Sequence, residues 1–106
     1  MAMFGRPQKV RLVSNEPKVV QFSPRGKPGR PDEIELGIDF LEALKLADFE
    51  GLDQTQAAQR MGISRATLGR ILREARRRIA DAVVNGKIIR IAGGNIRTKI
   101  NKKGRK

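Results

Sequence analysis

The chain has 106 residues and a net charge of +12, with 23 Lys and Arg residues against 11 Asp and Glu residues. It contains no cysteine and no histidine, which excludes disulfide bonds, thiolate nucleophiles, imidazole bases and the usual zinc sites. No apolar run approaches the roughly 20 residues of a membrane span, and the N-terminus lacks the apolar stretch of a signal peptide. We therefore expect a cytoplasmic or nucleoid-associated protein with no membrane contact, cofactor, metal or catalytic residue.

The charges are segregated along the chain. Residues 1–31 hold seven basic residues and one acidic residue, residues 32–62 two and eight, residues 63–91 eight and two, and residues 92–106 six and none. Solubility alone does not require such segregation, so the pattern favours a polyanionic partner. We expect the acidic block to lie on the face turned away from that partner.

Residues 1–31 are predicted to form a basic arm with a short β-hairpin. The stretches Lys9–Val13 and Lys18–Phe22 are rich in β-favouring residues, and the turn-forming sequence of Ser14–Pro17 separates them. Ser23–Pro31 contains three prolines and two glycines and predicts an extended linker. Two Gly-Arg-Pro triplets in this arm resemble minor-groove hooks, although linker chemistry explains them more simply.

Residues 32–91 are predicted to form the folded domain, which begins with two helices. A broad apolar face and acidic residues near its start predict a first helix from about Ile38 to Phe49, ended by Gly51. Asp53 is placed to cap a second helix, Gln54 to Met61.

A tight turn and a third helix follow. Ala57 and Ala58 are small enough for two helices to cross closely. Gly62 can adopt the positive φ that a three- to four-residue turn requires, and Ser64 is placed to cap the next helix. This combination is typical of a helix-turn-helix, with a third helix from about Arg65 to Val84.

The third helix has an apolar stripe and a separate basic face when plotted at 100° per residue. The stripe consists of Leu68, Ile71, Leu72, Ala75, Ile79 and Ala82. The residues predicted to contact DNA are Ser64, Arg65, Ala66, Thr67, Gly69, Arg70, Arg73, Arg76 and Arg77.

These residues suit a helix that enters the major groove with its N-terminal half. The arginines of the first turns are expected to reach base edges, while Arg76 and Arg77 are expected to meet phosphates. Gly69 either allows close approach to DNA or packs against the second helix. A solvated surface is the alternative for the arginines, and it is less favoured directly after such a turn.

The C-terminal part is predicted to contain one strand and a tail. Lys87–Ile91, KIIRI, predicts a short strand able to join the N-terminal hairpin. Residues 92–106 contain three glycines, six basic residues and no acid, and they predict a disordered basic tail.

The segments LADFEGL, QAAQRMGISRATLGRIL and ADAVVNGK resemble a small bacterial and archaeal family of uncharacterised proteins described as predicted DNA-binding proteins. The resemblance covers roughly Asp39 to Gly94. The family's helix-turn-helix is similar to the sigma-factor domain that reads the upstream promoter element. The resemblance implies a mainly α, winged-helix-like domain of three helices, with Gln56 through Ser64 as scaffold and turn. The implied recognition positions are Arg65, Ala66, Gly69, Arg70 and Arg73.

The leading interpretation is a transcriptional regulator that binds double-stranded DNA at specific sequences, with the choice between monomer and homodimer left open. The alternative is a sigma-like or RNA-associated adaptor that uses the same basic helix, with RNA polymerase or another protein on its acidic face. An enzyme is disfavoured because histidine, cysteine and a Gly-rich phosphate loop before a helix are all missing.

Overall fold

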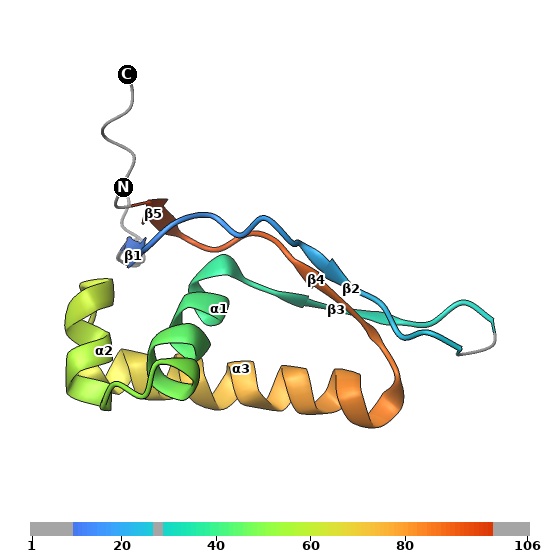
Figure 1. Cartoon of the computed structure of the whole chain (residues 1–106). Helices are drawn as coiled ribbons and strands as arrows, with labels where there is room; N and C mark the ends of the chain where they lie inside the picture. Colours follow the sequence, from blue (N-terminus) through green and yellow to red (C-terminus); the bar gives the residue numbers. More distant parts are fainter. Residues whose placement is uncertain (1–9, 27–28, 99–106) are drawn as a thin grey trace, which may run out of the picture.

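The computed structural model describes residues 10–26 and 29–98. A long helix runs along one side of the molecule, and a layer of strands runs along the other (Figure 1). Two shorter helices pack at the N-terminal end of the long helix (Figure 1). The Gly-Arg-Pro triplet at residues 5–7 and the predicted tail beyond residue 98 lie outside the described part of the chain.

The helices agree closely with those predicted. The first comprises α1 (Ile38–Leu44), which continues directly into the π-helical turn η1 (Lys45–Phe49). It is followed by α2 (Gln54–Met61) and α3 (Arg65–Asn85). No described helix combines the length and apolar character needed to cross a membrane.

A capping box fixes the start of α2, as the position of Asp53 predicts. The Asp53 carboxylate accepts a hydrogen bond of 2.8 Å from the Gln56 backbone N–H, and the Gln56 side chain accepts one of 3.1 Å from the Asp53 N–H. This exchange satisfies two of the backbone donors left free at a helix start.

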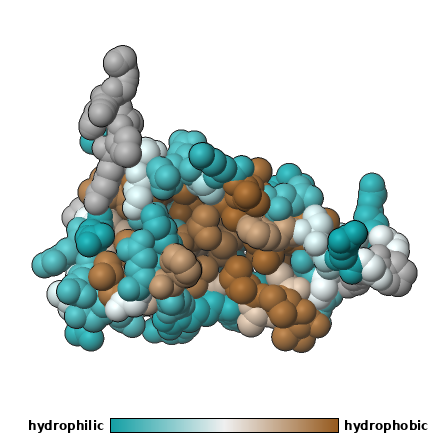
Figure 2. Space-filling model, in the orientation of Figure 1, coloured by the Kyte–Doolittle hydropathy of each residue, from teal (hydrophilic) through white to brown (hydrophobic). Residues whose placement is uncertain are grey.

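The core lies where the three helices meet. Leu68 and Leu72 of α3 are fully buried against Leu46 of η1 and Met61 of α2. Burial of each such side chain stabilises the fold by about 1.5–3 kcal/mol. The predicted apolar stripe of α3 is buried except for Ile79, which is half-buried. Apolar side chains also reach the surface over the middle and the C-terminal part of α3 (Figure 2).

The strands form two small sheets. In the larger sheet, β4 (Ile88–Ile91) lies between β2 (Gln21–Phe22), its antiparallel neighbour, and β3 (Glu33–Leu36), its parallel neighbour. In the smaller sheet, β1 (Arg11–Val13) pairs in parallel with β5 (Ile96–Thr98). The larger sheet packs against α3 through Leu36 and Ile91, which cover Ala75.

The predicted N-terminal hairpin is wrong. The strands β1 and β2 do not pair with each other, because β1 pairs with β5 and β2 pairs with β4. An isolated two-stranded hairpin is at best marginally stable, whereas β2 pairs with β4 as the edge strand of a three-stranded sheet that packs on a helix. The predicted strand at Lys87–Ile91 is confirmed as β4, with β3 as a partner that was not predicted.

The predicted disordered tail is wrong for residues 96–98, which form β5. The backbone N–H of Arg11 donates to the Asn95 carbonyl at 2.8 Å, at the start of this pairing. A strand that depends on a partner so distant in sequence has no local signal. The described residues of the predicted Ser23–Pro31 linker contain neither helix nor strand, as predicted.

Candidate nucleic-acid interface

The turn between α2 and α3 depends on the backbone of Gly62, which has φ +67° and ψ 33°. Its N–H donates to the Gln59 carbonyl at 3.1 Å, and the Ile63 N–H donates to the Ala58 carbonyl at 3.0 Å. A Cβ atom on Gly62 would lie 3.5 Å from the Leu12 side chain, an ordinary contact. Glycine is therefore favoured at this position because the backbone is left-handed, and not because space is short.

Ser64 caps α3 and begins a chain of side-chain hydrogen bonds. Its hydroxyl oxygen accepts from the Thr67 backbone N–H at 3.0 Å, and its O–H donates to the Thr67 hydroxyl at 2.9 Å. The Thr67 hydroxyl also accepts a longer hydrogen bond of 3.3 Å from the Arg70 guanidinium. The cap thus orients Arg70 on the exposed side of the helix.

The N-terminal half of α3 presents a basic surface, which we call the arginine face: Arg65, Arg70 and Arg73. All three side chains are exposed, and Ala66 is exposed beside them. Among the described residues, no carboxylate forms a salt bridge with any of the three. The positive end of the α3 macrodipole adds to this potential. This part of the surface is therefore suited to an anionic partner.

Gly69 faces the second helix without needing to be glycine. A Cβ atom built there would lie 3.7 Å from the Gln54 side-chain oxygen, which is an ordinary van der Waals distance. Packing of α2 on α3 would therefore accommodate alanine. The helix contact does not account for the cost of about 1 kcal/mol that glycine carries in a helix interior.

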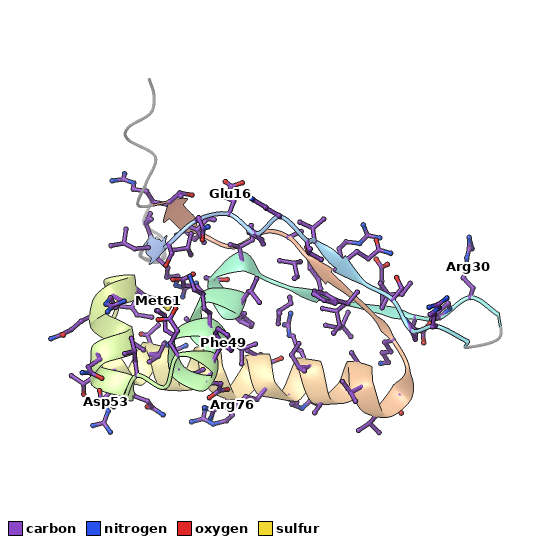
Figure 3. The ribbon with its side chains drawn as sticks, in the orientation of Figure 1. Glu16, Arg30, Phe49, Asp53, Met61 and Arg76 are labelled. Carbon is purple, nitrogen blue, oxygen red and sulfur yellow. The ribbon has the colours of Figure 1, made fainter. Side chains whose placement is uncertain are left out.

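Arg76 is not part of the arginine face, because it pairs with Asp48 on η1. Its guanidinium donates two hydrogen bonds to the Asp48 carboxylate, at 3.0 Å and 2.8 Å. These hydrogen bonds lower the pKa of Asp48 and raise the pKa of Arg76. Figure 3 labels Arg76 on α3 and Phe49 at the end of η1. Arg77 is exposed and forms no salt bridge within the described part of the chain.

A groove of about 400 Å³ borders the arginine face. Arg70 and Arg73 lie on one wall, and Arg11 of β1 lies on the other. The Arg11 guanidinium donates to the Asp39 carboxylate at 2.7 Å, and its Nε atom is buried without a partner among the described residues. Arg11 was not among the predicted residues, because only the fold brings β1 to the same groove as Arg70 and Arg73.

Two residues of the acidic block are buried and do not contribute to an acidic face. Asp39 and Glu42 are 2% and 6% exposed, and Glu42 accepts a hydrogen bond of 2.7 Å from the Ser14 hydroxyl. Other carboxylates of the block pair with arginines, as Asp48 does with Arg76. The expectation of an acidic face is therefore wrong for the two buried residues, which instead form hydrogen bonds inside the domain.

The fold and this surface define a small domain of three helices and a few strands, whose long third helix exposes a group of arginines. The chain belongs to the family described as "Protein of unknown function DUF134", whose model matches residues 1–99. Membership of an uncharacterised family, predicted from the sequence, is thus confirmed. The family description names no ligand.

Similar proteins from other bacteria carry the name "UPF0251 protein". The relative from Desulfosudis oleivorans is 55% identical over 91 residues, covering 85% of this chain and 66% of its own length. The relative from Prosthecochloris aestuarii is 50% identical over 91 residues, covering 85% and 59%. The chain thus spans less than two thirds of the length of either relative. No solved structure matches it.

Proposed function

We propose that this chain binds double-stranded DNA at specific sequences and regulates transcription. In this proposal α2, the turn at Gly62 and α3 act as a sigma-factor-like, winged-helix-like helix-turn-helix. The observation that carries the proposal is the arginine face, which is exposed and lacks carboxylate partners at the capped N-terminal half of α3. An α-helix fits the major groove of B-form DNA with this half toward the bases.

The side chains of this half suit direct readout of bases. Arginine can donate two hydrogen bonds to guanine, a contact worth about 1–3 kcal/mol of discrimination against other bases. The hydrogen bond from Arg70 to Thr67 limits the positions of its guanidinium before binding. Ala66 is exposed and offers a methyl group to thymine.

The later arginines have different roles in this proposal. Arg77 is exposed and contacts a phosphate, which adds affinity that falls with salt. Arg76 is held by Asp48 at 2.8 Å, so it contacts DNA only if that pair breaks. This revises the sequence-based expectation that both arginines meet phosphates.

The alternative adaptor has less support. Recognition of single-stranded RNA generally uses exposed aromatic rings for stacking. Phe22 and Phe49 are exposed, but they lie on β2 and η1, whereas the arginine face is on α3. Phe40 is half-buried beneath the Arg78 guanidinium, 5.4 Å from its ring centre. The burial of Asp39 and Glu42 also removes two charges from the proposed acidic contact surface.

A binding selection from a random duplex library tests the proposal, at about 150 mM salt so that counterion-driven binding is weak. We expect one sequence motif to emerge, with a Kd at least about 100-fold below that of random duplex in fluorescence anisotropy. Structured RNA of equal length is the control for the alternative. Tighter retention on RNA, or no capture of duplex at any salt concentration, would overturn the proposal.

A further inference from the structure

A second surface of the domain is apolar and exposed. We call it the apolar face: Leu41, Leu44, Phe49, Ile79, Val83 and Val84. Phe49, Val83 and Val84 are 85%, 73% and 78% exposed. The space-filling view shows apolar surface across the middle of the molecule and at the C-terminal end of α3 (Figure 2). Clustered apolar side chains of this kind mark interaction sites, whereas scattered ones do not.

The apolar face contains two neighbouring hollows. One hollow of about 490 Å³ is lined by Leu41, Leu44 and Phe49 on α1 and η1. A second hollow of about 560 Å³ shares Leu44 and extends to Val83 and Val84 on α3. The exposed side chains of Val83 and Val84 and the hollow at Leu41, Leu44 and Phe49 therefore lie on the same surface. A two-fold interface needs this property, because each copy must supply both parts.

The charged residues that line the two hollows, Lys45, Asp48 and Arg76, each have a partner of opposite charge. Asp48 pairs with Arg76 at 2.8 Å, and Lys45 lies 4.0 Å from Glu50. This balance contrasts with the +12 charge of the whole chain. Two copies with a large charge of the same sign repel each other, and they approach most easily through a neutral surface. A polyanion, by contrast, gains little from this surface.

We propose that the apolar face binds a second copy of this chain, with Val83 and Val84 of each copy in the hollow formed by Leu41, Leu44 and Phe49 of the other. The pairing removes the most exposed apolar side chains of α1, η1 and α3 from water. It leaves the arginine faces of both copies free, because they lie on the N-terminal half of α3.

The pairing sets a spacing on DNA, a consequence that rests on the proposed function. Along α3, the centre of the arginine face lies about 20 Å from Ile79, Val83 and Val84 at 1.5 Å per residue. Two copies related by a two-fold axis through the apolar face therefore place their arginine faces up to about 40 Å apart. This reach includes the roughly 34–36 Å between major grooves one helical turn apart.

Sedimentation velocity of the full chain at about 10–100 μM tests the pairing without DNA. We expect a dimer, and we expect Val84→Glu to raise its dissociation constant at least about tenfold. Val19→Glu is the matched control, because Val19 is 56% exposed and lines neither hollow. A wild-type chain that is monomeric at about 100 μM, or a Val84→Glu dimer as tight as wild type, would overturn the proposal.

The absence of cysteine allows a second test that does not depend on a destabilising variant. Chains with Val84→Cys and chains with Phe49→Cys are mixed and oxidised. We expect a mixed disulfide dimer, in clear excess over the product of Val84→Cys with Val19→Cys. Equal yields from the two mixtures would place the contact elsewhere.

The DNA experiments keep the two proposals separate. If the chain is monomeric at about 100 μM and still binds a selected duplex, the pairing fails and the proposed function stands. If the chain dimerises through Val84 but captures no duplex, the proposed function fails and the pairing stands. If both hold, Val84→Glu should weaken binding to two sites one turn apart and leave binding to one site unchanged.

Discussion

The two halves of α3 are both rich in arginine, but they differ in whether the arginines form salt bridges. Arg65, Arg70 and Arg73 in the first half have no carboxylate partner among the described residues. In the second half, Arg76 pairs with Asp48, and Arg78 pairs with Glu74 at 3.0 Å. A high arginine content is therefore weak evidence for a polyanionic partner. The informative feature is where arginines remain unpaired and exposed.

The guanidinium of Arg78 contacts groups on three elements of the fold. Its guanidinium donates to the Glu74 carboxylate and, at 2.8 Å, to the Glu35 carbonyl of β3, and it covers the Phe40 ring. This one side chain connects α3, β3 and α1. In the second half of α3, Arg76 and Arg78 therefore join elements, whereas Arg77 and the three arginines of the first half form no salt bridge among the described residues.

The largest expected effect comes from Asp39→Ala, which tests whether buried charge in the acidic block supports the fold. The change leaves the Arg11 guanidinium, 11% exposed, without its partner. Removal of one member of a buried pair costs about 3–5 kcal/mol. Urea unfolding followed by circular dichroism measures the loss. Glu50→Ala is the control, because its 4.0 Å contact with Lys45 is partly exposed and should contribute less than about 1 kcal/mol. Similar losses in both variants would contradict this account.

The next largest effect is expected from Gly62→Val, which tests how the arginine face is positioned. Valine is strongly disfavoured at φ +67°, so we expect a loss of roughly 2–3 kcal/mol in stability, visible as reduced helicity. Gly62→Asn is the control, because asparagine tolerates this conformation better and should cost about 1 kcal/mol or less. A Gly62→Val variant with wild-type stability would show that the turn does not require this backbone.

The helices could be predicted from local sequence signals. The pairing of the strands and the salt bridge of Arg76 could not, because they join residues far apart in the sequence. Gly62 and Ser64 act within a few residues of their own positions, so their roles could be predicted from the sequence. The strand β5 forms by pairing with β1. The paired residues are 85 positions apart in the sequence, as in the pair Arg11 and Ile96. A helical plot likewise places Arg76 on the basic face, because it contains no information on Asp48, 28 residues earlier.

Within the proposed function, Arg70→Ala tests the unpaired half of α3 and Arg76→Ala tests the paired half. We expect Arg70→Ala to weaken the selected duplex by about 1–3 kcal/mol, or roughly 5- to 150-fold in Kd, and random duplex much less. Arg76→Ala should change both Kd values less than twofold or threefold, because Asp48 already holds its guanidinium. Anisotropy at matched salt provides the values. An equal loss on both duplexes for Arg70→Ala would reassign that residue to phosphate contact.

A smaller effect is expected in the salt dependence of binding. Arg77→Ala should reduce the slope of log Kd against log salt by about one, because one phosphate contact is lost. Arg76→Ala should leave the slope unchanged if its guanidinium stays with Asp48 on DNA. If the two variants change the slope equally, the Asp48 pair must open on binding.

The smallest effect concerns the pH dependence of the Asp48 and Arg76 pair. The hydrogen bonds from Arg76 hold the pKa of Asp48 below the 3.8 of an unperturbed aspartate. Because the pKa is lowered in the folded state, the pair stabilises the domain fully above that value. The contribution is lost as the pH falls through the lowered pKa. Both side chains are about half exposed, so we expect a contribution below about 1 kcal/mol.

Carboxyl NMR titration of wild type and Arg76→Ala measures this pKa directly. Arg76→Ala should raise the pKa of Asp48 toward 3.8 and leave the lowered pKa of Asp81 unchanged, because Lys87 and Asn85 cause the shift of Asp81. Asp81 therefore serves as an internal control in the same spectra. If the pKa of Asp48 stays the same in both proteins, the pair does not persist in solution. Arg76 would then join the unpaired arginines, and the difference between the two halves of α3 would rest on Arg78 alone.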